Sequence, residues 1–155
     1  MSSSKVVNIY TDGSCINNGS PNATASLGVW VEGHPEKCLS ERIESGPQTN
    51  QVAELRALGR ALDISSDFEE INIHTDSRYA MNCITLWCRT WEKNGWKSSR
   101  GKHPTNMELI KEVITKLRRL QSDELVISFT YVSGHSGHEG NEAAHALAMS
   151  ASRFS

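Results

Sequence analysis

Apolar and polar residues alternate along the chain in patterns that predict its strands and helices. Runs rich in β-branched or alternating side chains are typical of strands, and they cover residues 5–11, 25–31, 37–43, 70–75 and 125–132. Leucine and isoleucine at helical spacing predict helices over residues 49–65 and 106–120, and residues 77–91 and 140–150 complete the helical set. The order β-β-β-α-β-α-α-β-α predicts an α/β fold, a mixed sheet with helices on its faces.

Turn and cap residues set the expected ends of these elements. The first strand should stop at Asp12-Gly13, because this pair is typical of turns. The second and third strands should pair antiparallel, joined near residues 33–35. Thr49 or Asn50 can cap the first long helix, and Asn106 can cap the helix over 106–120.

The bulk composition fits one globular domain over residues 1–155. No apolar run is long enough to cross a membrane, and the N-terminus resembles neither a secretory signal nor a transit peptide. The four scattered cysteines form no Cys-x-x-Cys pair, which favours free thiols in a reducing compartment, cytoplasmic or nuclear. The tidy ends favour a free-standing protein or a trimmed domain, and we expect a monomer.

Positive charge is concentrated in one segment. Residues 89–102 contain five basic residues and one acid, a local charge of +4, which leaves −6 for the rest of a chain whose net charge is −2. The basic residues are Arg89, Lys93, Lys97, Arg100 and Lys102. An acidic body with a basic protrusion suits a protein that holds metal ions in one place and phosphates in another. A solvated surface helix and loop is the alternative.

Three acids stand at places where a metal site can form. Asp12 follows the first strand, Asp76 follows the fourth, and Glu54 lies one turn into the first long helix. If these two strands are adjacent and parallel, their ends meet at the edge where ligands gather in α/β sheets. Close carboxylates repel unless a cation neutralises them, and hard oxygen ligands favour Mg²⁺. The alternative is that both aspartates only serve turns and helix caps.

Five motifs in order along the chain extend this picture. They are Tyr10-Thr-Asp-Gly-Ser, Gln48-Thr-Asn-Gln-Val-Ala-Glu, Thr75-Asp-Ser-Arg-Tyr, Trp91-Glu-Lys-Asn-Gly-Trp-Lys and Gly134-His-Ser-Gly-His-Glu-Gly-Asn-Glu. With these motifs the chain resembles the type 1 ribonuclease H family over residues 6–151. The resemblance implies a ribonuclease H-like five-stranded sheet, with three antiparallel strands and then two parallel ones, and a basic protrusion over residues 89–103.

The resemblance also implies an activity. Members of the family are metal-dependent endonucleases that hydrolyse the RNA strand of RNA–DNA hybrids and leave 5′-phosphate products. Asp12, Glu54 and Asp76 match their metal-binding carboxylates, which hold two Mg²⁺ ions with substrate, and Mn²⁺ is an expected substitute. His135 matches a mobile histidine that assists proton transfer or product release. The expected partner is an RNA–DNA hybrid, with no membrane.

The two strands of the hybrid are expected to meet different residues. The positions matching RNA contacts are Cys15, Asn17, Asn18, Gln48, Asn50 and Gln51. The positions matching DNA contacts are Tyr79, Trp87 and Trp91, a phosphate pocket of Thr49, Ser99 and Asn106, and the basic residues Lys97, Arg100 and Lys102. Trp96 is expected in the core of the protrusion. Pro47 replaces an arginine common in the family, which should weaken the phosphate pocket.

The chain departs from the family at His145, where the fourth metal-site aspartate usually stands. Two interpretations remain open. His145 is either a neutral ligand or a hydrogen-bond partner of a metal-bound water in an active enzyme, or the site is degraded and the protein binds hybrids without cutting them. More distant alternatives are a transposase or junction resolvase of the same fold, and a domain of a reverse transcriptase polyprotein.

Overall fold

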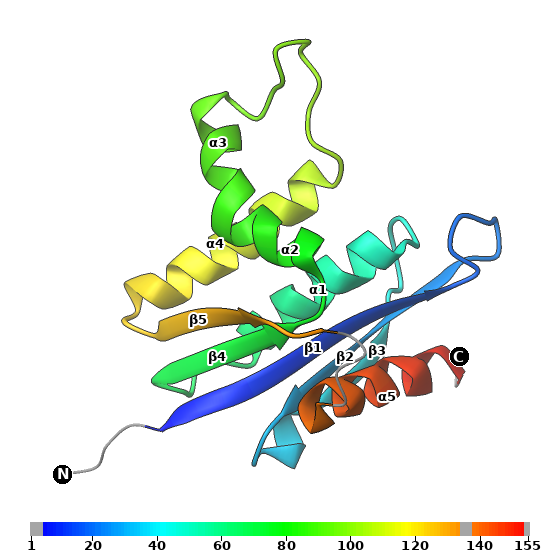
Figure 1. The fold of residues 1–155 in the computed structure, drawn as a ribbon, viewed down its shortest axis with the longest axis vertical. Coiled ribbons are helices and arrows are strands. Elements are labelled where there is room, and N and C mark those ends of the chain that lie inside the picture. The colour runs from blue at the N-terminus through cyan, green and yellow to red at the C-terminus, as the bar shows by residue number, and fades with distance from the viewer. Residues whose placement is uncertain (1–4, 134–137, 154–155) are drawn as a thin grey trace.

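A five-stranded mixed sheet organises the protein, seen in a computed structural model that describes residues 5–133 and 138–153 (Figure 1). The strands are β1 (Val6–Ile16), β2 (Thr24–Val31), β3 (Leu39–Arg42), β4 (Glu70–Thr75) and β5 (Val126–Tyr131). Their order in the sheet is β3-β2-β1-β4-β5, antiparallel from β3 to β1 and parallel from β1 to β5. The predicted fold class and the parallel pairing of the first and fourth strands are confirmed.

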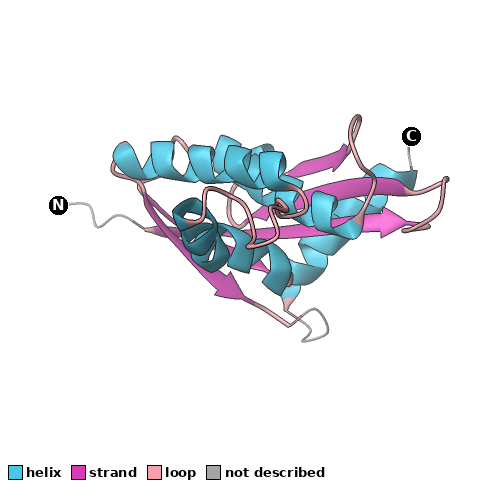
Figure 2. Ribbon diagram, turned by 90° about the horizontal axis from the view of Figure 1, so that it is seen from above, coloured by secondary structure: helices cyan, strands magenta, loops and turns pink. Residues whose placement is uncertain are grey.

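Helices cover both faces of the sheet. They are α1 (Asn50–Asp63), α2 (Arg78–Asn82), α3 (Cys88–Lys93), α4 (Met107–Ser122) and α5 (Glu139–Arg153). α5 packs against β1, β2 and β3 on one face, whereas α1 packs on the other face and α4 packs on α1 (Figures 1 and 2). Within the described ranges no helix has the length and apolar composition that crossing a bilayer requires.

The core lies between the sheet and α1. Ile9 of β1 and Ile73 of β4 are fully buried, and they belong to one apolar cluster with Leu55 and Leu58 of α1 and Ile110 of α4. Burying each of these side chains stabilises the fold by roughly 1.5–3 kcal/mol. This rigid layer holds the ends of β1 and β4 in fixed relative positions.

The expected turn at Asp12-Gly13 is wrong, because β1 continues to Ile16. Its parallel pairing with β4 ends at Thr11, but its antiparallel pairing with β2 runs on from Asp12↔Gly28 to Ile16↔Thr24. The ladder with β2 therefore overrides the local turn preference of Asp12-Gly13. Asp12 lies inside a strand, at the point where β1 loses one of its two neighbours.

The helix predicted over residues 77–91 contains a π-helical stretch, Cys83–Trp87, between α2 and α3. A π-turn disturbs the regular hydrogen bonding of an α-helix and leaves carbonyl groups to be satisfied otherwise. Thr85 Oγ1 donates to the carbonyl of Met81 at 2.7 Å, and the Cys88 thiol donates to the carbonyl of Ile84 at 3.5 Å. Side chains thus stabilise this irregular segment, which leads from the sheet into the protrusion.

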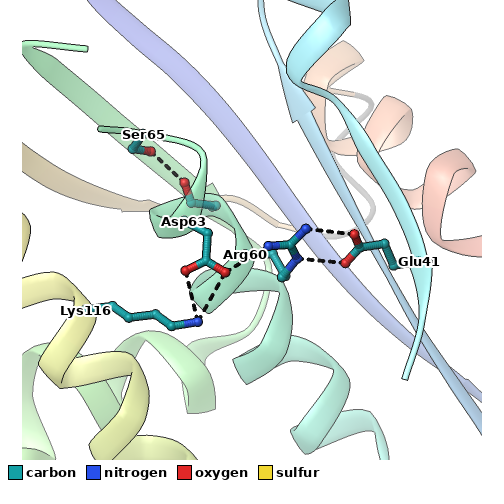
Figure 3. A network of polar contacts seen from close by, with 6 residues as sticks. Glu41, Arg60, Asp63, Ser65 and Lys116 are labelled. Carbon is teal, nitrogen blue, oxygen red and sulfur yellow. Dashed lines mark hydrogen bonds and ion pairs between the residues drawn. The ribbon is translucent and has the colours of Figure 1, made fainter. Parts of the chain in front are cut away.

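Salt bridges connect α1 to β3 on one side and to α4 on the other (Figure 3). The guanidinium of Arg60, in α1, forms two hydrogen bonds of 2.8 Å with the carboxylate of Glu41, in β3. Arg60 also contacts Asp63 at 2.9 Å, and Lys116 of α4 contacts Asp63 at 3.0 Å. The bidentate geometry favours a fixed orientation of the pair. The network therefore helps to hold α1, which carries Glu54, in place.

Candidate active site

Three carboxylates from three elements lie together at the edge of the sheet where β4 ends. Asp12 follows the last residue of β1 that pairs with β4, Asp76 follows β4, and Glu54 lies in α1. One carboxylate oxygen from each residue lies within 4.8 Å of the others. The expectation that the first and fourth strands bring Asp12 and Asp76 together is confirmed.

Two glycines let helices approach this edge closely. A β-carbon at Gly13 would lie 2.4 Å from the backbone of α1 at Glu54, and one at Gly28 would lie 2.1 Å from the carbonyl of Ala144 in α5. Such distances are shorter than van der Waals contact, so only glycine fits at either place. Gly13 also donates its backbone N–H to Glu54 Oε1. Close packing at these glycines brings Glu54 and His145 beside Asp12 from opposite faces of the sheet.

The electrostatics of the cluster favour a cation. Burial, and next the charge of Asp76, raise the pKa of Asp12 to about 6, although a hydrogen bond from His145 opposes this shift. Burial, followed by the charges of Asp12 and Asp76, raises the pKa of Glu54 well above its ordinary value. Asp76 Oδ1 is buried and has no hydrogen-bond partner among the described residues. Mutual repulsion and an unsatisfied buried oxygen are what a hard divalent cation relieves, so these residues fit a metal ion.

His145 acts on the cluster through Asp12. Its Nδ1 lies 2.8 Å from Asp12 Oδ2, a distance typical of a charge-assisted hydrogen bond. Asp12 is 6% exposed in its side chain, whereas His145 is 62% exposed. The sequence offered a metal ligand or a partner of a metal-bound water, and the structure adds a direct contact with a carboxylate that the sequence did not predict.

A cavity of about 690 Å³ opens over the carboxylates. Its lining consists of Asp12, Gly13, Asn50, Glu54, Asp76, Asn141, Glu142 and His145. Asn50, predicted as an RNA contact, therefore lies at the site. Asn141 is buried at the cavity wall and was not predicted, although the Gly-Asn-Glu motif at the start of α5 carried that signal.

Several predicted RNA contacts lie near this cavity but are engaged in the fold. The side-chain amide of Gln48 donates to the carbonyl of Ile43 at 2.9 Å and accepts from the N–H of Ala25 at 2.7 Å. The Cys15 thiol donates to the carbonyl of Gln48 at 3.3 Å. The Gln48 side chain thus has a clear structural role, and its contact with RNA stays a prediction.

A hydrogen bond connects the loop that follows β1 to the start of α1. The side-chain oxygen of Asn18 accepts from the backbone N–H of Asn50 at 3.3 Å, and Asn17 adopts a left-handed conformation with φ of 58°. Gln51 is exposed on the first turn of α1. The hydrogen bond places Asn18 beside the first residue of α1, and the contact of Asn17, Asn18 and Gln51 with RNA stays a prediction.

A row of aromatic rings leads from α2 into the protrusion. Ring centres lie 6.2 Å apart between Tyr79 and Trp87, 6.2 Å between Trp87 and Trp91, and 5.6 Å between Trp91 and Trp96. The expected proximity of Trp87 and Trp91 is confirmed. Trp96 is partly buried, with the ammonium group of Lys111 lying 5.1 Å from its ring centre, which agrees with its predicted place in the core of the protrusion.

Asn106 is the N-cap residue of α4, as predicted, but its side chain does not act as the cap. It adopts a left-handed conformation with φ of 65° and makes no side-chain cap hydrogen bond. Its amide instead donates to the hydroxyl of Tyr79 at 3.0 Å. The cap of α1 is Thr49, whose hydroxyl accepts from the N–H of Val52 at 3.1 Å. Tertiary contact with α2 therefore outweighs local capping at Asn106.

One cavity includes a single residue of the predicted phosphate pocket, Asn106. Asn106 lines a cavity of about 550 Å³ together with Pro47, Arg56 and His103, but neither Thr49 nor Ser99 is among its lining residues. The role of the trio Thr49, Ser99 and Asn106 stays a prediction. Arg56 and His103 were missed by sequence reasoning, since no local pattern connects α1 with the loop before α4.

The predicted basic residues extend away from the sheet on the loop after α3 (Figure 1). Lys97, Arg100 and Lys102 are exposed, and none of the three has an ion pair with any described carboxylate. The amide of Ser98 donates to the carbonyl of Lys102 at 2.7 Å and shapes the loop. His135 lies outside the described residues.

Comparison with known proteins places these features in a family. The model of the family described as RNase H matches residues 4–153. Ribonuclease H1 of Homo sapiens is 40% identical over 151 residues, covering 95% of this chain and 50% of that protein. Ribonuclease H of Parvibaculum lavamentivorans is 35% identical over 148 residues, covering 96% of this chain and 93% of that protein. The chain thus spans about half the length of the human relative.

The fold comparison agrees. The crystal structure of LC9-RNase H1, described as a type 1 RNase H with the type 2 active-site motif, superposes with a TM-score of 0.73 at 26% identity, covering 97% of this chain and 74% of that one. The foamy viral protease-reverse transcriptase in complex with RNA/DNA hybrid has the same fold, with a TM-score of 0.72 at 22% identity, covering 97% of this chain and 20% of that one. With the sheet order, the three carboxylates and the family match in agreement, this chain belongs to the type 1 ribonuclease H family.

Proposed function

We propose that the protein is an endoribonuclease that hydrolyses the RNA strand of RNA–DNA hybrids with divalent metal ions. The observation that carries the proposal is the cluster of Asp12, Glu54 and Asp76, which converge within 4.8 Å at the cavity. The buried Oδ1 of Asp76 has no hydrogen-bond partner in the part of the chain that the structure describes. The names of the relatives, ribonuclease H and ribonuclease H1, support the same activity. Phosphodiester hydrolysis by such a cluster would give 5′-phosphate products.

Asp12, Glu54 and Asp76 would hold the metal, for which we propose two Mg²⁺ ions in the presence of substrate. Bound Mg²⁺ would supply a Lewis acid that activates water and stabilises charge on the leaving oxygen. The protein's own contribution is to fix the ligands. Glu54 is held by the N–H of Gly13, and Asp12 is held by His145.

His145 keeps the site competent in this proposal. An ionised Asp12 can only accept a hydrogen bond, so Nδ1 of His145 donates in this pair and Nε2 is the ring nitrogen that remains for a ligand. Imidazole nitrogen suits Mn²⁺ better than Mg²⁺. We therefore propose that this residue shifts the metal preference towards Mn²⁺ compared with a fourth carboxylate.

The hybrid would lie across the cavity and the protrusion. In this arrangement Asn50 and its neighbours meet the RNA strand, while the row of Tyr79, Trp87 and Trp91 packs against the DNA sugars, which lack the 2′-hydroxyl. The exposed cations of residues 89–103 would contact phosphates. Residues 6–151 would then form the catalytic domain, acting as a monomer. The four cysteines are free, which supports a reducing compartment, cytosol or nucleus.

One cleavage assay tests the proposal. Labelled RNA–DNA hybrid, RNA duplex and DNA duplex are incubated with Mg²⁺ and with Mn²⁺ in parallel, and only the RNA strand of the hybrid should be cut, internally. Cleavage of the DNA duplex would contradict the proposal and favour a DNA-processing activity.

A second function is favoured by a specific observation, since an imidazole stands where the family has an acid. In that reading the protein binds hybrids without cutting them. Binding of the hybrid without cleavage in either metal would establish it.

A further inference from the structure

Arg78 is held at the edge of the sheet that carries the carboxylates. It is the first residue of α2, two positions beyond Asp76, and its guanidinium carbon lies 4.4 Å from the ring centre of Tyr131. Tyr131 is the last residue of β5 and pairs in register with Thr75 of β4. The N–H of Val132 donates to the carbonyl of Thr75 at 2.9 Å, which fixes the end of β5 beside the residue preceding Asp76.

The environment of Arg78 differs from that of the cations that form salt bridges within the chain. Arg60, Arg118 and Lys116 all pair with carboxylates at 2.6–3.0 Å. Among the described residues, the Arg78 side chain takes part in no ion pair or hydrogen bond, and its guanidinium lies over the ring of Tyr131. Both Arg78 and Tyr131, the latter 37% exposed, are open to solvent.

Stacking holds a guanidinium by its face and leaves its N–H donors, which lie in the plane of the group, available. A planar fork of free donors matches the two oxygens of a phosphodiester. The ring of Tyr131 limits the orientations of the side chain before any ligand arrives, so less conformational entropy is lost on binding. The pair is therefore arranged for an anion from outside the chain.

We propose that Arg78 binds a phosphodiester of the RNA strand next to the linkage that is cut, and that Tyr131 positions it. The proposal rests on the proposed function and adds a substrate contact to it. The choice of strand follows from α2, where the next residue, Tyr79, is directed to Asn106 and Trp87 on the proposed DNA side. Arg78 is directed instead to the end of β5, at the edge of the sheet where β4 ends and Asp76 follows, rather than along the aromatic row.

The charge of Arg78 is tested by salt dependence. Arg78→Met keeps an apolar stem and removes the charge, so the slope of log association constant against log salt for the hybrid should become shallower by about one. KM should rise about tenfold, as expected for loss of a charge-assisted contact, with kcat changed less than twofold. Arg119→Met, an exposed arginine on α4, is the matched control and should leave both unchanged. An unchanged slope in Arg78→Met overturns the proposal.

The positioning role of Tyr131 has a different signature. Tyr131→Phe keeps the ring and should behave as the wild type. Tyr131→Leu removes it while Arg78 stays charged, so KM should rise about threefold with no change in the salt slope. A Tyr131→Leu variant with wild-type KM shows that the stacking does no positioning and overturns that part.

The strand assignment is tested with hybrids that carry one uncharged methylphosphonate linkage, each compared with a phosphodiester of the same sugar chemistry. At one position in the RNA strand the neutral linkage should raise KM for the wild type and have no effect on Arg78→Met. The assignment is contradicted if KM rises only for neutral linkages in the DNA strand. It is also contradicted if a neutral linkage raises KM equally for the wild type and Arg78→Met. Wild-type cleavage of the unmodified hybrid separates the two proposals, because its absence would refute the function itself.

Discussion

In the carboxylate cluster, the side chain of Asp12 is 6% exposed and three acids converge within 4.8 Å. In the protrusion, by contrast, Lys97, Arg100 and Lys102 are exposed and form no ion pair with a described residue. The cluster is built on strands and helices that approach at Gly13 and Gly28. The protrusion is a short helix and a loop that extend from the body of the molecule (Figure 1). Negative charge is thus buried in the body of the molecule, and positive charge is exposed to solvent on the protrusion.

The two regions use charge for different purposes, the cluster to hold a metal ion and the protrusion to attract nucleic acid. Buried like charges destabilise the fold but keep ligand atoms in a fixed geometry, which metal-dependent catalysis requires. Exposed cations attract a polyanion over about a Debye length and tolerate small displacements, at the expense of sensitivity to salt. Changes in the cluster should therefore affect kcat, and changes in the protrusion should affect affinity.

The largest effect is expected from the carboxylates. Asp12→Asn, Glu54→Gln or Asp76→Asn should each lower the cleavage rate at least about 100-fold, because each removes a metal-holding charge that contributes several kcal/mol to transition-state stabilisation. Binding of the hybrid should change little. Single-turnover cleavage and equilibrium binding measure the two separately, with Asp123→Asn, an exposed acid after α4, as the control. Near wild-type cleavage by Asp76→Asn would show that the metal site is assigned wrongly.

The protrusion should give the complementary result. Replacing Lys97, Arg100 and Lys102 together by glutamine should flatten the salt dependence of hybrid binding by up to about three units of slope. Affinity at low salt should fall by a factor of about ten or more, with kcat at saturating substrate almost unchanged. Lys5→Gln with Arg119→Gln serves as a control on other exposed cations. An unchanged slope would mean that the protrusion points away from the nucleic acid.

A smaller effect is expected from His145, which links the cluster to α5. An aspartate there adds a negative charge and an oxygen ligand, so His145→Asp should need roughly five- to tenfold less Mg²⁺ for half-maximal cleavage. Mn²⁺ should narrow this gap, because it accepts nitrogen ligands more readily. His145→Ala should be slower than wild type at subsaturating metal. If all three proteins share one metal titration, position 145 takes no part in catalysis.

The smallest expected effect concerns stability without metal. The folded-state pKa of Asp12, about 6, exceeds its ordinary value of 3.8, so folded protein binds this proton more tightly than the unfolded chain. The resulting stability is fully present below about pH 4 and is lost as pH rises through about 6, on the order of 3 kcal/mol. In EDTA the unfolding temperature should therefore fall over this window.

Asp76→Asn isolates the part of that loss that comes from the charge of Asp76, which raises the pKa of Asp12 next after burial. Removing the neighbouring charge should raise the unfolding temperature in EDTA at pH 7.5 by a few degrees, and by less at about pH 4.5. Mg²⁺ should stabilise the wild type more than the variant, since only the wild type has all three charges to neutralise. If Asp76→Asn and the wild type have the same unfolding temperature at each of the two pH values, the carboxylates do not repel one another in the folded protein.

Local patterns determined the elements of this protein well. Residues 70–75 were predicted as a strand and form β4 with those bounds, and the helix expected over 106–120 is Met107–Ser122. The Thr-Asp pairs after two predicted parallel strands were enough to predict that Asp12 and Asp76 meet, although β1 itself continues to Ile16. These features depend on residues near one another in sequence, where hydrophobic period and turn chemistry carry the information.

Features that need two distant segments were decided only by the tertiary structure. The turn expected at Asp12-Gly13 gave way to the ladder with β2, and the cap expected at Asn106 gave way to a hydrogen bond with Tyr79. The contact between His145 and Asp12 joins residues 133 positions apart, through packing of α5 on Gly28. The sequence by itself determined which groups are available, and only the packing of the elements decided which partner each group has. The physical reason is that a hydrogen bond or close contact forms wherever geometry allows, and geometry between distant segments is set by the whole core.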